Sequence, residues 1–291
     1  GIKTLEHLIN CNHDVAVIYS TVPAACGAVF TQNKMCAAPV LVSREVNKQP
    51  YAQAILVNSG CANACTGAQG LEDAKKMQAH GAEMLGIKPE HAFVCSTGVI
   101  GHFLPMDKLM IGIADAVDAM DEAEGESCAM AIQTTDTFIK KAAYETEIDG
   151  KVVKIAGIAK GAGMIHPNMA TMLTFITTDC AIAPDVLTRA VKAAADKSFN
   201  MVVVDGDTST NDSMIVLANG LAENEIIFSE EHPDYPAFFE MLVACATDLA
   251  KLIAHDGEGA TKFLEVNIVG AATWEDAKTA AMAIAKSPLV K

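Results

Sequence analysis

A glycine-rich segment that leads into an apolar run holds the residues best suited to chemistry. Residues 160 to 180 read KGAGMIHPNMATMLTFITTDC. Gly161 and Gly163 permit backbone conformations that a β-carbon would exclude, and Pro167 fixes its own φ and pushes the preceding residue out of the helical region. The chain therefore bends before Thr171, which opens a mostly apolar and β-branched run that favours a buried strand.

Thr171 could act as a nucleophile if a base takes its proton. A threonine hydroxyl is otherwise weakly reactive, and the residue's own α-amine can serve as the base once the preceding peptide bond is cut. An α-amine has an unperturbed pKa of about 7.7 to 8.0, which suits this task near neutral pH. The segment therefore predicts a self-cleaving junction that yields a catalytic threonine. The alternative is that Thr171 only caps a strand after a tight turn, because glycine-rich turns commonly precede strands.

A second set of hydrogen-bond donors ends the short strand expected over residues 91 to 98, HAFVCSTG. The hydroxyl of Thr97 and the amide of Gly98 can direct two donors at one point, which is what an oxyanion hole requires. The same two residues could instead cap the N-terminus of whatever follows. Both interpretations place them at the end of a strand.

Other polar residues lie at turns between the expected elements. Thr134 opens the run TTDT, whose hydroxyls could bind the polar head of a substrate, although a turn or helix end is the ordinary structure. Lys160 and Glu258 are by default a solvated loop charge and an exposed acidic turn. The turn 205 to 212, DGDTSTND, is acidic, but its spacing differs from that of a calcium loop. We therefore expect it to order local backbone and to bind no metal.

Composition narrows the class of partner. The formal net charge is −15 over 291 residues, which argues against nucleic acid and anionic membranes and favours a small-molecule substrate. No apolar run approaches the roughly 18 to 20 residues of a membrane helix, and the start of the chain does not resemble a signal peptide. The nine cysteines predict buried thiols in a reducing compartment, the cytoplasm. Their spacing matches no familiar zinc site, so we expect no metal. We also expect no cofactor.

The elements that must position these residues alternate between strands and helices, which predicts an α/β fold of layered sheets covered by helices. The sharpest turn signal is Asp149-Gly150, which is typical of a hairpin. Strands are expected over 14–20, 27–31, 38–43, 53–60, 91–98, 143–149, 152–158, 172–178, 201–206 and 263–271. Helices are expected over 71–86, 105–121, 123–133, 183–200, 235–254 and 274–287.

The segment KGAGMIHPNMATML resembles, almost residue for residue, the self-cleavage segment of the ornithine acetyltransferase (glutamate N-acetyltransferase) family, in which an Ala-Thr bond is cut. The resemblance continues in NSGCANACTG, CSTGVIG, TTDT, DGDTSTND and HDGEGATK and covers effectively the whole chain. It implies cleavage between Ala170 and Thr171, and a fold shared with autoproteolytic aminopeptidases. The products would be an α chain of 1–170 and a β chain of 171–291, which stay associated. The C-terminal portion found in that family is expected to be missing.

The resemblance also implies a role for each polar residue. Thr171 becomes the nucleophile and a substrate contact, and Thr97 and Gly98 become the oxyanion hole. A lysine suits a substrate carboxylate, and a glutamate suits a substrate amino group. Three further residues are assigned to substrate binding by the resemblance: Thr134, Lys160 and Glu258.

Together these roles predict an acyltransferase of arginine biosynthesis that moves acetyl from N-acetylornithine to glutamate through acetyl-Thr171, with ping-pong kinetics. Acetyl-CoA is an alternative donor, which would add N-acetylglutamate synthesis. We expect a homo-oligomer of the α and β chains, with no nucleic acid or membrane partner. Two alternatives remain. One is an autoproteolytic aminopeptidase, in which water completes the reaction, and the other is a non-catalytic module in which Lys160 and the glycine loop hold an anion.

Overall fold

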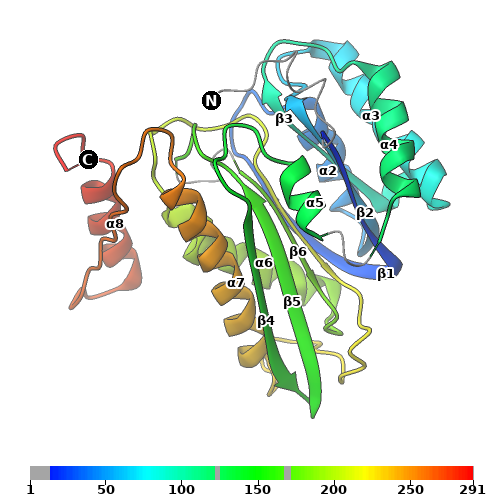
Figure 1. The fold of residues 1–291 in the computed structure, drawn as a ribbon. Helices are drawn as coiled ribbons and strands as arrows, with labels where there is room; N and C mark the ends of the chain where they lie inside the picture. Colours follow the sequence, from blue (N-terminus) through cyan, green and yellow to red (C-terminus); the bar gives the residue numbers. More distant parts are fainter. Residues whose placement is uncertain (1–13, 122–124, 167–171, 291) are drawn as a thin grey trace.

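The computed structural model describes residues 14–121, 125–166 and 172–290 and is built on a seven-stranded sheet (Figure 1). The strand order is β3-β2-β1-β7-β6-β5-β4. The strands are β1 Val15–Phe30, β2 Tyr51–Cys61, β3 Ala92–Val99, β4 Lys140–Ile148, β5 Lys151–Lys160, β6 Leu173–Thr178 and β7 Ser213–Ala218. The helices are α2 Ala38–Val46, α3 Gly67–Leu85, α4 Met106–Asp118, α5 Gly125–Ala131, α6 Pro184–Lys197, α7 Tyr235–His255 and α8 Trp274–Ala285. The 3-10 helices are η1 Pro89–His91 and η2 Phe199–Met201.

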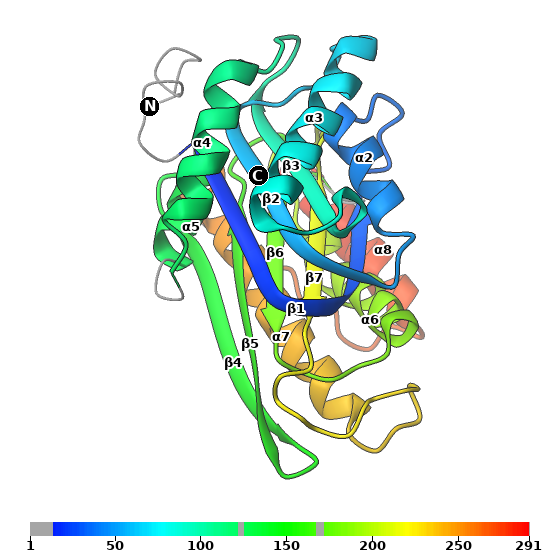
Figure 2. The same ribbon diagram turned by 90° about the vertical axis from the view of Figure 1, so that its right-hand side faces the viewer.

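Strand β1 joins the two halves of the sheet. Its first part pairs antiparallel with β2, from Val15 to Tyr19, and its second part pairs antiparallel with β7, from Ala25 to Phe30. The register with β2 shifts between Tyr19 and Ala24. The strand curves strongly along its length (Figure 2). Because β1 is long and bent, strands β2 and β3 are carried over β5, β6 and β7 instead of continuing one flat sheet.

The packing of the two halves gives four layers. Side chains alternate along a strand, so each half has two faces. The outer face of β2 and β3 packs under α2, α3 and α4, and the outer face of β5, β6 and β7 packs under α6 and α7. The inner faces meet in a shared apolar core that joins Ile55 and Phe93 from one half to Phe175, Ile215 and Leu217 from the other. The expected fold of layered sheets covered by helices is confirmed.

Several local predictions are confirmed and one apolar run is reassigned. The hairpin at Asp149-Gly150 joins β4 to β5, with both residues in the left-handed region that its turn type requires. The strand expected over 38–43 is wrong, because this segment forms α2. Pro39 lies in the first turn of α2, where its missing amide donor has no consequence. The buried positions Ala38, Val42 and Val46 recur every four residues, which is a helical period hidden by β-branched residues.

Two further strand predictions are wrong. The segment 201–206 begins at the last residue of the 3-10 helix η2 and has no strand pairing among the described residues. The buried strand of this region is β7, which begins at Ser213. The segment 263–271 forms no strand, and its apolar Leu264 and Val269 are exposed. A run of β-formers becomes a strand only where a partner strand is available. The separate strands expected over 14–20 and 27–31 are one continuous strand, β1.

Strand ends that are far apart in the sequence meet at one edge of the layers. Leu173 at the start of β6 pairs with Lys160 at the end of β5 and with Ser213 at the start of β7. On the other half, Thr97 near the end of β3 lies opposite Ser59 of β2. The fold therefore positions the polar residues of β3, β5 and the loops around β6 as neighbours. Within the described residues, no helix is long and apolar enough to cross a membrane.

Candidate active site

Lys160 joins two of the predicted site residues. Its Nζ donates to Thr97 Oγ1 at 3.1 Å and to Thr134 Oγ1 at 2.8 Å. The lysine is 3% exposed, so the solvated loop charge of the default interpretation is wrong. Burial lowers the pKa of Lys160 more than the carboxylate of Asp136 raises it. An ammonium group only donates hydrogen bonds, so both threonine hydroxyls accept from it and direct their own protons elsewhere.

Gly98 lies where two backbones touch. Its φ is +130°, and a β-carbon on this residue would lie 2.3 Å from the carbonyl carbon of Gly60 and 2.7 Å from the amide nitrogen of Cys61. Only glycine fits both the dihedral angle and the space. Strand β3 therefore ends in direct contact with β2, and this contact sets the backbone position that follows Thr97.

A buried charge cluster supports Lys160. Lys140 is fully buried, and its Nζ lies 2.6 Å from Asp136 Oδ1 and 2.6 Å from Asp256 Oδ2. Asp136 also accepts a hydrogen bond of 2.7 Å from the amide of Gly161, and Asp256 accepts one of 2.9 Å from the amide of Thr137. Burial raises the pKa of Asp136, but the positive charges of the two lysines and the Gly161 amide outweigh it and hold the pKa below its usual value.

This cluster connects the three segments that carry the predicted substrate contacts Thr134, Lys160 and Glu258. Asp136 follows Thr134 by two residues, and Asp256 precedes Glu258 by two. Lys140 and Asp256 are 116 positions apart in the chain. None of Asp136, Lys140 and Asp256 was predicted as a site residue, because a lysine in a strand and two aspartates in turns carry no local signal of burial.

Glu258 lies against the glycine loop. Its amide donates to the carbonyl of Ala162 at 2.7 Å, and a β-carbon on Gly163 would lie 2.5 Å from the glutamate carboxyl group. The side chain is exposed, yet it contributes to the electrostatic environment of Lys160. The absence of a side chain at Gly163 therefore lets an acidic group approach the loop after Lys160.

Asp212 marks the downstream side of the junction. It is fully buried, and its Oδ1 accepts a hydrogen bond of 2.9 Å from the amide of Met172. Burial raises the pKa of Asp212 well above its ordinary value, against the opposing effect of that hydrogen bond. Ala170 and Thr171, the predicted cleavage site and nucleophile, lie outside the described residues. Thr97, Thr134 and Lys160 are brought into direct contact, with Gly98 and Glu258 beside them, while their chemical roles stay predictions.

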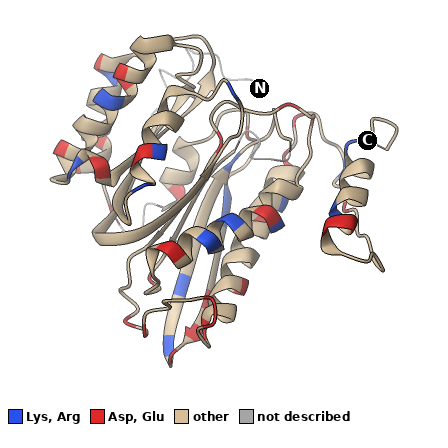
Figure 3. Cartoon of the chain, turned by 180° about the vertical axis from the view of Figure 1, so that it is seen from behind, with Lys and Arg blue, Asp and Glu red and all other residues tan. Residues whose placement is uncertain are grey.

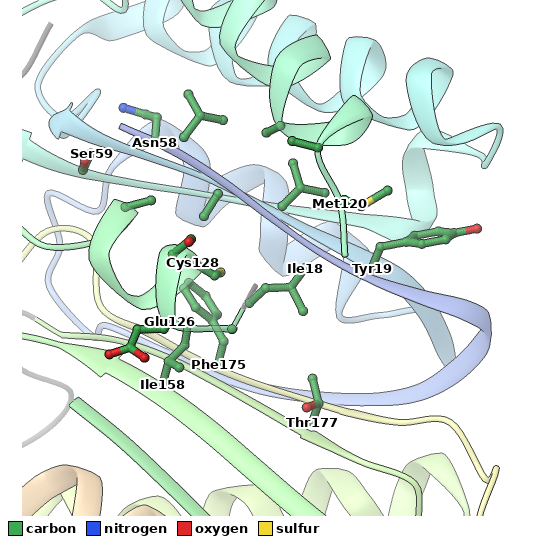
Figure 4. Close-up of a pocket in the computed structure, with 18 of the residues that line it drawn as sticks. Ile18, Tyr19, Asn58, Ser59, Met120, Glu126, Cys128, Ile158, Phe175 and Thr177 are labelled. Atoms are coloured by element: carbon green, nitrogen blue, oxygen red, sulfur yellow. The ribbon is translucent and has the colours of Figure 1, made fainter. Parts of the chain in front are cut away.

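A large groove lies between the layers (Figure 4). Its volume is about 1710 Å³, and Ile18, Asn58, Cys128, Phe175 and Thr177 are among the residues that line it. None of the five described site residues lines this groove. The candidate site therefore rests on the side-chain contacts around Lys160. Acidic side chains are spread over several helices and loops of the molecule (Figure 3). Among the described residues, no three His, Cys, Asp or Glu side chains group as metal ligands.

Comparisons with known proteins agree along the whole chain. The sequence model of the ArgJ family matches residues 1–291. The arginine biosynthesis bifunctional protein ArgJ of Geobacillus stearothermophilus is 50% identical over 280 residues, which cover 96% of this chain and 68% of the relative. That of Symbiobacterium thermophilum is 53% identical over 279 residues, covering 96% and 69%.

Solved structures are similar as well. The crystal structure of arginine biosynthesis bifunctional protein ArgJ from Bacillus halodurans is 43% identical with a TM-score of 0.52, covering 58% of this chain and 89% of that one. A Burkholderia sp. beta-aminopeptidase has a TM-score of 0.50 at 11% identity, covering 88% and 87%. The second likeness concerns the fold alone.

Proposed function

The chain belongs to the ArgJ family, and from this we propose that it is an acetyltransferase of arginine biosynthesis that moves acetyl from N-acetylornithine to glutamate. The observation that carries the proposal is the contact of Lys160 with both Thr97 and Thr134. Thr97, Thr134 and Lys160 come from three distant segments of the chain and are joined by two buried hydrogen bonds. A chance arrangement of solvated turns would not bury this lysine between two hydroxyls.

In the first half-reaction, Thr171 forms an acetyl ester. Its hydroxyl oxygen attacks the acetyl carbonyl of N-acetylornithine, and its proton passes to its own α-amine. Thr97 and Gly98 donate to the oxyanion of the tetrahedral intermediate. The carbon–nitrogen bond then breaks, the leaving nitrogen takes the proton from the α-ammonium group, and ornithine departs.

In the second half-reaction, glutamate receives the acetyl group. Its neutral amine attacks the ester carbonyl of acetyl-Thr171, the same two donors hold the oxyanion, and the ester bond breaks. The proton lost by the attacking amine returns to the threonine oxygen through the α-amine. The two substrates react in turn at one site, so ping-pong kinetics follow.

Lys160 serves this chemistry by orienting hydroxyls. Because the ammonium donates to Thr97 Oγ1, the proton of that hydroxyl is directed away from the lysine and is available to an oxyanion. The positive charge behind the hydroxyl also strengthens it as a donor in a site from which water is largely excluded. Two of the three N–H bonds of Lys160 go to the threonines, and we assign the third to a substrate carboxylate. Glu258 is assigned to the substrate amino group.

The two chains produced by cleavage should stay associated. Strand β5 lies before the junction and β6 after it, and they pair from Ile155 and Thr178 to Lys160 and Leu173. Helix α7, also after the junction, packs on the outer face of β4 and β5. We propose a homo-oligomer of such α and β pairs. The eight cysteines in the described part of the chain are free thiols, which suits the cytoplasm.

Three measurements on the purified protein test the proposal. A denaturing gel with N-terminal sequencing should show a smaller band that starts at Thr171. Mass spectrometry after incubation with N-acetylornithine and no glutamate should place one acetyl group on that chain, and Thr171→Val should abolish both results. Acetyl-CoA is supplied in a parallel sample as the alternative donor. The Geobacillus stearothermophilus relative provides the positive control.

Each rival function predicts a different outcome. An aminopeptidase would be cut at the same bond but would release acetate or amino acids to water and transfer no acetyl to glutamate. An anion-binding module would remain one uncut chain. Acetyl on a residue other than Thr171 would refute the mechanism while leaving the transferase activity in place.

A further inference from the structure

The acidic turn of residues 205–212 holds the chain upstream of the predicted cleavage site. The carboxylate of Asp205 accepts hydrogen bonds from the amides of Met164 at 2.5 Å and Ile165 at 2.9 Å. In return, the amide of Val204 donates to the carbonyl of Ile165 at 2.9 Å. Met164 has a φ of +59°, which is uncommon for a residue with a side chain. Asp205 therefore stabilises this left-handed conformation upstream of the junction.

The same turn holds the chain downstream of the cleavage site. Asp212 ends the turn, and its fully buried carboxyl group accepts the amide hydrogen of Met172 at 2.9 Å. The amide of Ser213 donates to the carbonyl of Met172 at 3.2 Å. The residue that directly follows Thr171 is thus fixed at both its amide and its carbonyl. Burial raises the pKa of Asp212, in accord with its position away from solvent.

Asn211 connects this turn to the candidate oxyanion hole. Its Nδ2 donates to the carbonyl of Ser96 at 2.8 Å and to the carbonyl of Ala62 at 2.7 Å. Ser96 is the residue before Thr97, and Asn211 itself is buried. Asn211 and Asp212, which are consecutive in the chain, therefore bind the end of β3 and the residue directly before β6.

We propose that the 205–212 turn is a positioning clamp for the Ala170–Thr171 bond. Asp205 holds the chain before this bond, Asp212 holds the chain after it, and Asn211 holds the end of β3, which carries Thr97. The proposal rests on the function proposed above. It gives a role to the 205–212 turn, to which the proposed function assigns no substrate contact. Asp205 serves self-cleavage, whereas Asn211 and Asp212 serve both cleavage and acetyl transfer.

The clamp matters because self-cleavage is a reaction of the chain with itself. The hydroxyl oxygen of Thr171 attacks the carbonyl carbon of Ala170, and the proton of that hydroxyl moves to the amide nitrogen of Thr171. The carbon–nitrogen bond breaks and leaves an ester, which water hydrolyses to a carboxyl group on Ala170 and a free hydroxyl on Thr171. Attack requires a defined approach, and a displacement of about 1 Å can reduce such a rate by roughly 100-fold.

The test separates cleavage from transfer in the full chain. Variants Asp205→Ala, Asp212→Ala and Asp212→Asn are followed by intact mass to obtain the cleavage rate. Turnover is then measured per cleaved site, with sites counted by acetyl trapping. The matched control is Asp179→Ala, since Asp179 also accepts a backbone amide, that of Lys154 at 2.7 Å, at a place remote from the junction. Thermal melts identify variants that do not fold.

We expect Asp205→Ala to slow cleavage at least roughly tenfold and to change turnover per cleaved site by less than about threefold. Asp212→Ala should reduce both rates at least roughly tenfold. Asp212→Asn keeps an acceptor oxygen for Met172 and should restore most of both. Asp179→Ala should match the wild type in each measurement.

Cleavage of Asp205→Ala at the wild-type rate would overturn the clamp, as would an Asp212→Asn variant no better than Asp212→Ala. The cleavage rate of Asp205→Ala tests the clamp even if Asp212→Ala fails to fold. A wild-type chain that is never cut or acetylated would instead overturn the proposed function, and the inference with it. The two failures are therefore distinguishable.

Discussion

Replacing Thr97 by valine removes one hydroxyl from the candidate oxyanion hole and leaves the shape of the side chain nearly unchanged. Thr97 is 4% exposed, so the valine methyl group fills the same space without contact with water. Loss of an oxyanion donor raises the activation free energy by about 2.7 to 4 kcal/mol, which corresponds to a fall in kcat of roughly 100- to 1,000-fold. The substrate's ground-state contacts are unaffected, so KM should change little.

The same substitution has a second, smaller effect. Lys160 loses the hydroxyl that lies 3.1 Å from its Nζ, and a buried donor without its acceptor destabilises the fold by about 1 to 3 kcal/mol. Thr134→Val is the matched control, because it removes the other hydroxyl of Lys160, at 2.8 Å, without touching the oxyanion hole. Thr97→Ser keeps the hydroxyl and should retain most of kcat.

The assay is steady-state acetyl transfer from N-acetylornithine to glutamate, normalised to cleaved chains, with a urea titration of each variant. We expect kcat to fall for Thr97→Val, and KM to rise for Thr134→Val. A Thr97→Val variant that keeps more than about a tenth of the wild-type kcat would show that Thr97 is not an oxyanion donor. An equal fall in kcat for both valine variants would show the same, because the effect would then come only from the loss of a partner for Lys160.

The buried charges around Lys140 and the contact of Gly98 with Gly60 give three further expectations. Lys140→Met leaves two buried carboxylates unpaired and should lower the free energy of unfolding by about 3 to 5 kcal/mol. Lys48→Met, which breaks an exposed ion pair, should change it by at most about 1 kcal/mol; equal losses in urea titrations would contradict the role of burial. Gly98→Ala places a methyl 2.3 Å from backbone and should cost about 1 to 3 kcal/mol, so an unchanged urea midpoint would argue against that contact. The pKa of Asp136 is lowered in the fold, so its stabilisation is present above about pH 4 and is lost as pH falls below that value. In Asp136→Asn the free energy of unfolding should therefore fall less at acid pH than in the wild type. The same fall in both proteins would show that Asp136 is not its source.

Much of the molecule follows from local pattern. The hairpin at Asp149-Gly150 and the helices α3, α4, α6 and α7 lie where turn residues and apolar spacing predict them. These features depend on backbone preferences and on an apolar face, and both are written in neighbouring residues. The hydroxyls and glycines at the ends of strands were also recognisable, because their types already limit the chemistry available.

Other features required the tertiary structure. Nothing near Lys140 in the sequence shows that it is buried between Asp136 and Asp256, and nothing near Lys160 shows that it reaches Thr97 on the other half of the sheet.

By itself, then, the sequence determined which residues could carry acetyl transfer and which segments prefer to be helix or turn. The fold decided which of those residues meet, because long-range contacts depend on the bend of β1 and on how the two sheet halves pack. That packing is a property of the whole chain, and no local window of residues contains it.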